Sequence, residues 1–464
     1  TFIVEGFPDG KLDFIGNALQ YEKNGVPKGT EELSRRVGFT GNVNYIYNNR
    51  HFMDLSFRVD ASSLFGTKNK FAPFWSAGIG WNVHNEKFMQ SQNIVNNLRI
   101  RGSYGETGSQ QFASYQALST FQSYTGKRYI IWNGAELMGL GNEKLKWQVT
   151  KQLNGGVEVG LFDGRLSASF DIYSKKTSNL LSQMDLPLAN GFSSYVDNVG
   201  EVKNTGYEAM ISGYLMRDTH RNIIWSMTAK LAYTKNEITK LSEAIKRQNE
   251  LYKSKDVEIN QLLYEGYAQN SIWAVPSMGI DPSTGYEIFL DKNGNITDKW
   301  NPSDKRYFGV DEPKYRGNIS TYFAWRDLSV NLSFAYQWGG QQYNETLLNK
   351  VEVTNGEIDK NNVDSRVLKK RWQYIGDVKP YKGYGSVETK ATSRFVMDDN
   401  VFQFQSASVE YRLHSDFLRD KWKVETISIG ANMSDIFYIS SIKRERGTSY
   451  PFARRLALTL SLMF

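Results

Sequence analysis

The chain has 464 residues, with 56 Lys and Arg against 49 Asp and Glu for a net charge of +7, four His and no Cys. The absence of cysteine excludes a disulfide scaffold and thiolate metal sites, and no stretch approaches the roughly 18–20 apolar residues of a membrane-spanning helix. The positive charge is spread along the chain, so we expect no nucleic-acid partner and interpret it as solvated loops that can attract anionic lipid.

Aromatic residues make up 14% of the chain, and an alternation of apolar and polar residues recurs along it. A period of two is typical of strands with two different faces. The alternation predicts about 13 strands, each long enough to cross a bilayer when tilted. They are Arg35–Asn48, His51–Ala61, Pro73–His84, Val95–Gly105, Gln148–Phe162, Arg165–Lys175, Asn204–Met216, Ile223–Asn236, Tyr315–Trp325, Leu328–Gln341, Phe402–Leu413, Val424–Ser434 and Phe452–Phe464.

The closing strand has one apolar face and one small, polar face. Its apolar positions are Leu456, Leu458, Leu460, Leu462 and Phe464. In earlier strands the polar positions include Arg58, Arg99 and Arg101. Since Lys or Arg on the lipid face at the bilayer midplane costs about 2–4 kcal/mol, we expect these arginines to face the interior of a barrel and the apolar positions to face lipid.

The connections between these strands alternate in length. Short links are 49–50, 85–94, 163–164, 217–222, 326–327 and 414–423, and long ones are 62–72, 106–147, 176–203, 237–314, 342–401 and 435–451. Outer-membrane barrels have short periplasmic turns and longer outside loops, whereas a β-sandwich has no reason to sort its connections this way. The pattern therefore favours an all-β, antiparallel transmembrane barrel.

The same alternation predicts a direction for the chain. If Phe464 lies at the periplasm, every long connection is extracellular and residues 1–34 belong to an outside loop. Bacterial single-chain barrels have an even number of strands, and an open sheet edge is not tolerated in hydrocarbon. We therefore expect residues 35–464 to be the C-terminal part of a longer barrel.

Two groups of aromatic residues suggest different roles. Those near predicted strand ends, Trp81, Trp225, Tyr233, Trp325, Tyr336 and Trp338, are interpreted as interfacial girdles. Those in long connections, Tyr129, Trp132, Trp273, Trp300 and Tyr307, are the candidate ligand-binding residues. They can stack on a sugar or a peptide, and packing within the loops explains them equally well.

The remaining motifs are interpreted as turns, surface residues or a short helix, and not as sites of chemistry. The sequence predicts no catalytic residue, metal site or cofactor, and the scattered histidines are assigned to turns and surfaces. Asn293-Gly294 predicts a hairpin turn in preference to a calcium loop. Ile238, Leu241 and Ile245 have helical spacing and predict a short helix within the connection 237–314.

Several blocks, in order along the chain, resemble the SusC/RagA-like branch of TonB-dependent outer-membrane transporters of Bacteroidetes. They are Arg58–Gly66 running on to Trp75 and Gly80-Trp81, Leu98–Gly105 with Thr107-Gly108, Asn198–Glu208, Gly279–Pro282 with Thr284-Gly285, and the terminal Phe464. Each block is weak alone, and the ordered set is specific.

The resemblance implies a barrel of about 22 strands around an N-terminal plug, which has no counterpart in this chain. It implies a SusD-like surface lipoprotein as a lid, uptake of oligosaccharides or peptides driven through TonB, and no enzymatic step. Alternatives are a TonB-dependent receptor for a smaller ligand, such as a siderophore or vitamin, and a surface adhesin or structural β-protein. We expect an outer-membrane location, with lipid or lipopolysaccharide around the barrel and TonB reached through the missing N-terminal segment.

Overall fold

The computed structural model describes residues 4–5, 20–21, 33–65, 70–109, 117–130, 132–186, 189, 191–192, 194–253, 262–353, 364–385, 388–443 and 454–464. Of the predicted outside loop 1–34, it describes β1 (Val4–Glu5), β2 (Gln20–Tyr21) and residues 33–34, and β1 pairs antiparallel with β2. The rest of that predicted loop lies outside the described residues.

One antiparallel sheet of 13 strands dominates the structure, and its strand order follows the chain. All 13 predicted strands are confirmed. They are β3 (Arg36–Tyr47), β4 (His51–Ser62), β5 (Phe71–Asn82), β6 (Val95–Ser109), β9 (Gln148–Leu161), β10 (Leu166–Asp185), β11 (Ser194–Asp218), β12 (Ile223–Leu241), β18 (Tyr315–Trp325), β19 (Leu328–Tyr343), β20 (Val396–Leu413), β21 (Thr426–Ser440) and β22 (Arg455–Met463).

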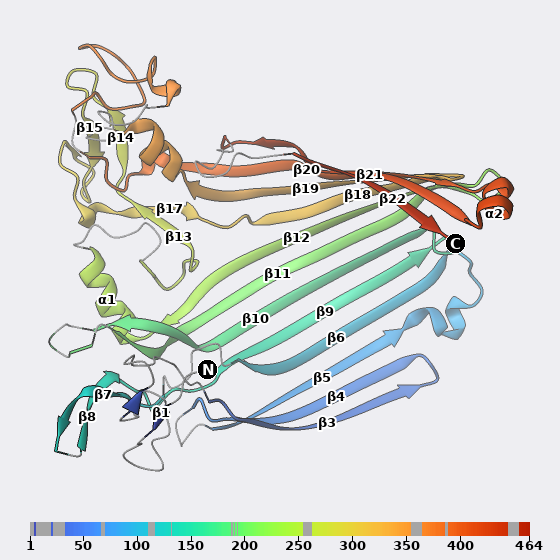
Figure 1. Ribbon diagram of the computed structural model, residues 1–464, viewed down its shortest axis with the longest axis horizontal. Coiled ribbons are helices and arrows are strands. Elements are labelled where there is room, and N and C mark those ends of the chain that lie inside the picture. Colours follow the sequence, from blue (N-terminus) through green and yellow to red (C-terminus); the bar gives the residue numbers. More distant parts are fainter. Residues whose placement is uncertain are drawn as a thin grey trace.

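The connections sort as predicted. Figure 1 shows the long strands side by side, with the long connections gathered at one end of the sheet and the short links at the other. The C-terminus lies at the end with the short links, beside helix α2 (Asp416–Trp422). In this sheet β3 and β22 are the two edge strands. The described strands thus form an open section of a barrel wall.

Smaller elements lie within the connections. The paired strands are β7 (Thr120–Tyr129) with β8 (Trp132–Gly139), β13 (Ser271–Ala274) with β17 (Arg306–Val310), and β14 (Ser277–Ile280), β15 (Glu287–Leu290) and β16 (Ile296–Thr297) as a three-stranded sheet. The helices are α1 (Glu243–Lys253), α2, a π-helix at Leu347–Glu352, and 3-10 turns at Val83–Asn85, Lys87–Met89, Pro302–Asp304, Ser365–Val367 and Ser393–Phe395. Among the described helices, none is long and apolar enough to cross a membrane.

Within the connection 237–314, one detail differs from the sequence prediction and one agrees with it. Ile238 and Leu241 belong to strand β12, so the predicted helix begins only at Glu243 and keeps Ile245. The side chains of Ile238, Leu241 and Ile245 all pack in one buried cluster, the first two from the strand and the third from the helix. Their shared burial explains why all three are apolar although they do not belong to one helix. Asn293-Gly294 forms the turn between β15 and β16, as predicted.

Several strands run further than the alternation predicted. β10 continues past Lys175 to Asp185 and stays paired with β11 up to Asp185 and Ser194. Backbone pairing needs no apolar face, so a strand that leaves the lipid keeps its hydrogen bonds but loses the alternating pattern. The ends of β10, β11 and β12 therefore project beyond the lipid into the long connections.

The apolar positions of the sheet are exposed. Leu456, Leu458 and Leu460 are 65%, 77% and 68% exposed, so they pack on no second sheet. Buried apolar clusters lie instead at the ends of the strands and in the long connections. One joins Phe65, Phe74, Leu145 and Trp147, a second joins Met184, Val202, Ile238 and Ile245, and a third joins Val351, Val367, Tyr381 and Phe395. This distribution suits a sheet whose apolar face is covered by lipid.

The predicted girdle residues occupy the exposed apolar face. A continuous aromatic belt, formed by Phe170, Tyr207, Tyr233, Tyr315, Trp338 and Tyr336, crosses β10 to β19 with centroid distances between 5.0 and 5.9 Å. On β18, Tyr315 of this belt and Trp325 near the short links are the first and last of 11 residues. That separation is about 33 Å of strand and about 25 Å of height in a tilted barrel, which matches the apolar band of an outer membrane.

Candidate functional site: the interior face and the outer loops

The interior face of the sheet, which is the face opposite the aromatic belt, carries the predicted arginines. The Arg101 Nη2 atom lies 2.7 Å from Asp171 Oδ1 and 3.5 Å from Glu158 Oε1. Register explains the grouping, because Arg101 and Asp171 both pair with Gly156 of β9 and so share a face. The prediction that Arg58, Arg99 and Arg101 leave the apolar face is confirmed.

The interior face holds ion pairs and neutral polar side chains. One further ion pair on it joins Glu410 and Arg412 of β20. Between β12 and β21, hydroxyl and amide side chains line a hollow of about 420 Å³. Its lining includes Ser226, Thr228, Asn318, Ser320, Asn331, Ser333, Ser406, Ser408 and Asn432. Such side chains donate and accept hydrogen bonds without demanding a charged ligand.

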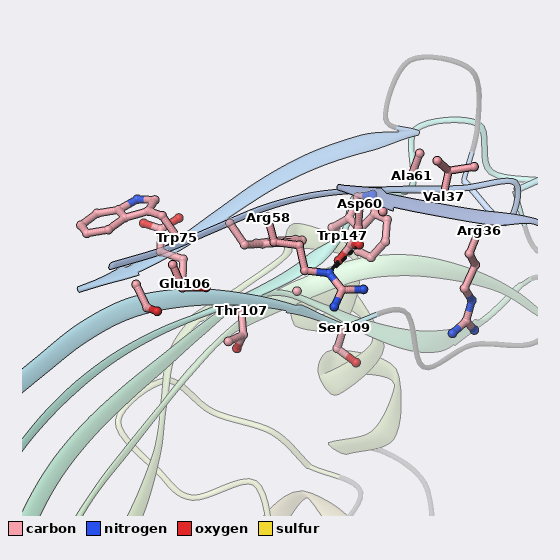
Figure 2. A pocket seen from close by; sticks show the side chains of 15 residues that line it. Arg36, Val37, Arg58, Asp60, Ala61, Trp75, Glu106, Thr107, Ser109 and Trp147 are labelled. Atoms are coloured by element: carbon pink, nitrogen blue, oxygen red, sulfur yellow. Dashed lines mark hydrogen bonds and ion pairs between the residues drawn. The ribbon is translucent and has the colours of Figure 1, made fainter. Parts of the chain in front are cut away.

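A larger hollow of about 830 Å³ lies where β5 and β6 part. Their pairing ends at Ser76 and Gly105, so the outer halves of the two strands separate. Figure 2 shows the Arg58 side chain of β4 near Asp60 and facing Thr107 and Ser109 of β6. The Arg58 Nε atom donates to Asp60 Oδ1 at 2.7 Å. The hollow therefore presents this ion pair and four hydroxyl side chains, those of Ser56, Ser76, Thr107 and Ser109, with Arg36 and Glu106 also on its lining.

Aromatic packing holds the hollow open. Trp147, which also lines it, stacks on Phe65 at 4.5 Å and meets Phe74 edge-on at 5.9 Å. The Phe74 ring occupies the space that a side chain at Gly108 would need, with a Cβ only 2.0 Å from the ring. The Phe74 ring thus fills the space beside Gly108 at the edge of the hollow.

The structure brings together two of the five predicted loop aromatics. Trp273 of β13 and Tyr307 of β17 are cross-strand partners, with ring centroids 5.9 Å apart. Trp300 lies elsewhere, and its indole N–H donates to the carbonyl oxygen of Ala391 at 3.1 Å. Tyr129 and Trp132 pair at the ends of β7 and β8, and their side chains lie outside the described part of the structure.

Two further tyrosines, missed in the sequence, complete this aromatic loop cluster. Tyr264 lies 4.6 Å and Tyr267 lies 5.1 Å from the Trp273 ring, and Tyr267 lies 5.0 Å from Tyr307. Their proximity to Trp273 in sequence was the available signal. Backbone hydrogen bonds between Ile238 and residues 266–267 hold the cluster against the end of β12.

The aromatic loop cluster is partly core and partly open surface. Trp273 is 9% exposed, and its indole N–H has no acceptor among the described residues. Tyr267 and Tyr307 are 39% and 43% exposed. Burial raises the pKa of the Tyr264 and Tyr307 hydroxyls, so both stay neutral at physiological pH. The exposed ring faces of Tyr267 and Tyr307 are suited to stack on a sugar or a peptide.

A buried ion network positions this cluster. Arg394 contacts Glu287 at 3.0 Å and Glu352 at 2.7 Å, and the Lys382 ammonium lies 3.6 Å from Glu287. Burial opposes the charge of Glu287, but hydrogen bonds from Arg394 outweigh it and hold its pKa below the usual range. Beside Arg394, Ser393 donates its N–H to the Val275 carbonyl at 2.9 Å, which fixes the chain that follows Trp273.

Comparisons with known proteins agree with this architecture. The family described as "TonB dependent receptor-like, beta-barrel" matches residues 17–354. The chain is 28% identical to TonB-dependent receptor P3 of Formosa agariphila, over 97% of this chain and 45% of that protein. It is 25% identical to TonB-dependent receptor SusC of Bacteroides thetaiotaomicron, over 71% of this chain and 34% of that protein.

A solved structure shares the fold. The RagAB peptide importer in its open-open state aligns with a TM-score of 0.79 and 22% identity, over 97% of this chain and 50% of that chain. The present chain spans less than half the length of the curated relatives it matches.

Proposed function

The chain belongs to the TonB-dependent receptor-like β-barrel family of the outer membrane, and on that premise we propose that it forms the C-terminal wall and loops of a SusC/RagA-type importer. Its substrates are oligosaccharides or peptides that bind at the aromatic loop cluster and pass along the interior face. The proposal includes no covalent chemistry. Strands from outside this chain complete the wall beside β3 and β22, and a plug from the same source couples uptake to TonB.

One observation carries the substrate proposal, namely the exposed Tyr267 and Tyr307 rings, whose centroids lie 5.0 Å apart over the buried Trp273. Exposed aromatic faces can stack on a sugar ring or on a peptide side chain. Their hydroxyl groups can also donate to the oxygen atoms of either ligand. The hydroxyl and amide side chains that line the hollow between β12 and β21 offer further hydrogen-bonding groups along the interior face.

The test is a Tyr307→Ala variant of the intact receptor, which removes one of the two exposed ring faces. An aromatic contact is worth about 1 kcal/mol, so binding of oligosaccharides or of tryptic peptides should weaken about fivefold. Tyr286→Ala is the matched control, because this tyrosine is 51% exposed and lies outside the cluster. Wild-type affinity in Tyr307→Ala, or an equal loss in Tyr286→Ala, would contradict the assignment.

A surface lipoprotein lid of the SusD type is the second part of the proposal. The turn at residues 374–378 presents Tyr374, Ile375 and Val378, which are 74%, 83% and 83% exposed. Asp377 accepts the Tyr374 N–H at 3.1 Å, and Gly376 donates its N–H to the Pro282 carbonyl at 2.8 Å. A rigid turn with large exposed apolar side chains is suited to anchor a protein partner. A receptor for a smaller ligand would show no stable lipoprotein partner in pull-down experiments.

A further inference from the structure

A row of charged side chains crosses the outer wall, on the same face as the aromatic belt. Register places Glu106 of β6 opposite Lys151 of β9, Lys151 opposite Lys176 of β10, Lys176 opposite Lys203 of β11, and Lys203 opposite Glu237 of β12. Residues directly opposite one another share a face of the sheet. The outer face of these five strands therefore carries an aligned row of charges.

The height of the row corresponds to the lipid headgroups. On β12 the outward positions run Tyr233, Lys235 and Glu237, so the charges follow directly beyond the aromatic belt on the extracellular side. Lys176 is the eleventh residue of β10 counted from Leu166, which is about 25 Å above the short links in a tilted strand. That is the top of the apolar band, where hydrocarbon gives way to headgroups.

The row presents more positive than negative charge. Lys151 pairs with Glu106 at 3.1 Å, Lys176 with Glu201 at 2.7 Å, and Lys235 with Glu237 at 2.8 Å. In every pair the lysine is the more exposed partner, at 52%, 49% and 59% for the lysine side chains against 20%, 26% and 35% for the carboxylates. Lys203 adds a fourth exposed lysine. The carboxylates thus orient the lysines and leave the ammonium groups outermost.

This lysine group is local. On β18 and β19 no lysine takes the corresponding place, because the residues two positions beyond the belt residues Tyr315 and Trp338 are Pro313 and Gly340. The four lysines occupy β9 to β12 only, and three strand spacings of about 4.8 Å span about 14 Å. A general attraction to anionic lipid would not concentrate them on four adjacent strands.

We propose that Lys151, Lys176, Lys203 and Lys235 form a binding site for the phosphorylated headgroup of one outer-leaflet lipid, with its acyl chains lying over the aromatic belt. The aromatic rings of the belt would contact the acyl chains, and the ammonium groups above them would contact the phosphorylated headgroup. Ammonium groups bind phosphate as point charges. This inference does not depend on the substrate or partner proposed above.

Native mass spectrometry of the detergent-solubilised, intact receptor tests this site. Diphosphoryl lipid A should remain bound, and its dephosphorylated form should bind at least tenfold more weakly. Each lysine near a charged membrane surface is worth about fivefold in affinity, so Lys176→Gln and Lys203→Gln should each reduce lipid A binding by about that factor. Raising the salt concentration should weaken the complex further.

Lys175→Gln is the matched control, because Lys175 is the chain neighbour of Lys176 and points to the interior face. Its loss should leave lipid A binding unchanged. Equal binding of the two lipid forms, or an equal loss in Lys175→Gln and Lys176→Gln, overturns the proposal. Displacement of bound lipid A by an equimolar amount of inorganic phosphate also overturns it, since that result would show a free-anion site and no contribution from the lipid.

Discussion

The guanidinium of Arg394 lies 3.0 Å from the carboxylate of Glu287, although 107 positions separate the two residues in the chain. Glu287 comes from the long connection between β12 and β18, and Arg394 comes from the connection between β19 and β20. Glu352 completes the contact, and both carboxylate side chains are 1% exposed. The two loops are thereby fastened together at the end of the sheet where the long connections gather.

Replacing Arg394 by Met should release these loops without unfolding the sheet. Removing Arg394 leaves Glu352 buried without its cation and leaves Glu287 with Lys382 alone, and breaking a buried ion pair typically costs about 3–5 kcal/mol. Hydrogen exchange measured in lipid should accelerate in β13 to β17 and in residues 364–385, and remain slow in β18 and β19. Lys390→Met is the control, because its exposed ion pair with Glu388 contributes little. Unchanged exchange in Arg394→Met would show that the network does not hold the loops.

The pH dependence of the loops follows from Glu287. Its pKa is lowered in the folded loops, so it contributes stability that is fully present above the pKa of about 4.3 of an unfolded Glu. That contribution is lost as the pH falls through the lower, folded value. Tryptophan fluorescence of the loops should therefore stay constant from pH 7 to pH 5 and change only below about pH 4. A Glu287→Gln variant should lose this acid transition, and a wild-type transition near pH 6 would contradict the assignment.

Truncation of Tyr233 to Ala should destabilise the barrel by about 1–3 kcal/mol, since each aromatic pair adds about 0.5–1.5 kcal/mol. Tyr233 packs against Tyr207 at 5.1 Å and Tyr315 at 5.0 Å in the middle of the aromatic belt. Urea unfolding in lipid vesicles measures the difference. Tyr233→Phe keeps both ring contacts and should retain most of the stability. Equal losses in the two variants would assign the effect to the hydroxyl group.

The lid proposal predicts that Ile375→Asp abolishes co-purification of the surface lipoprotein. Ile375 is 83% exposed in a turn fixed by its own hydrogen bonds, so a charge there should leave the loop folded. Leu251→Asp is the matched control, because this exposed residue of α1 lies in another loop. Retention of the partner by Ile375→Asp would remove this turn from the interface.

Much of the wall could be predicted from the sequence because each strand is a local pattern. The prediction for β18, Tyr315–Trp325, matches its observed bounds, and Arg101 lies on the predicted face. Outside the lipid, the alternation of apolar and polar residues stops although the strand continues. The sequence therefore predicted the end of β10 at Lys175, whereas the strand runs to Asp185. The lipid face is readable because hydrocarbon imposes one chemical requirement on every second residue.

The candidate site was harder to predict because distant segments build it. The contact between Arg394 and Glu287 leaves no local pattern, and the grouping of Tyr264 with Tyr307 depends on how β13 and β17 pair. Trp273 and Tyr307 were recognised as single candidates, whereas their contact required the loop fold. The separation of Trp300 from them likewise follows from its bond to Ala391.

The central claim is that one face of this sheet meets lipid and the other lines an aqueous interior. The chain has no native cysteine, so single cysteines placed in β19 at Leu332 and Ser333 report each face without background. With spin labels in lipid vesicles, the account predicts that Leu332→Cys is accessible to oxygen dissolved in the bilayer and that Ser333→Cys is accessible to a water-soluble nickel chelate. Equal accessibility to the chelate at both positions, or protection of both from oxygen and chelate, would contradict it.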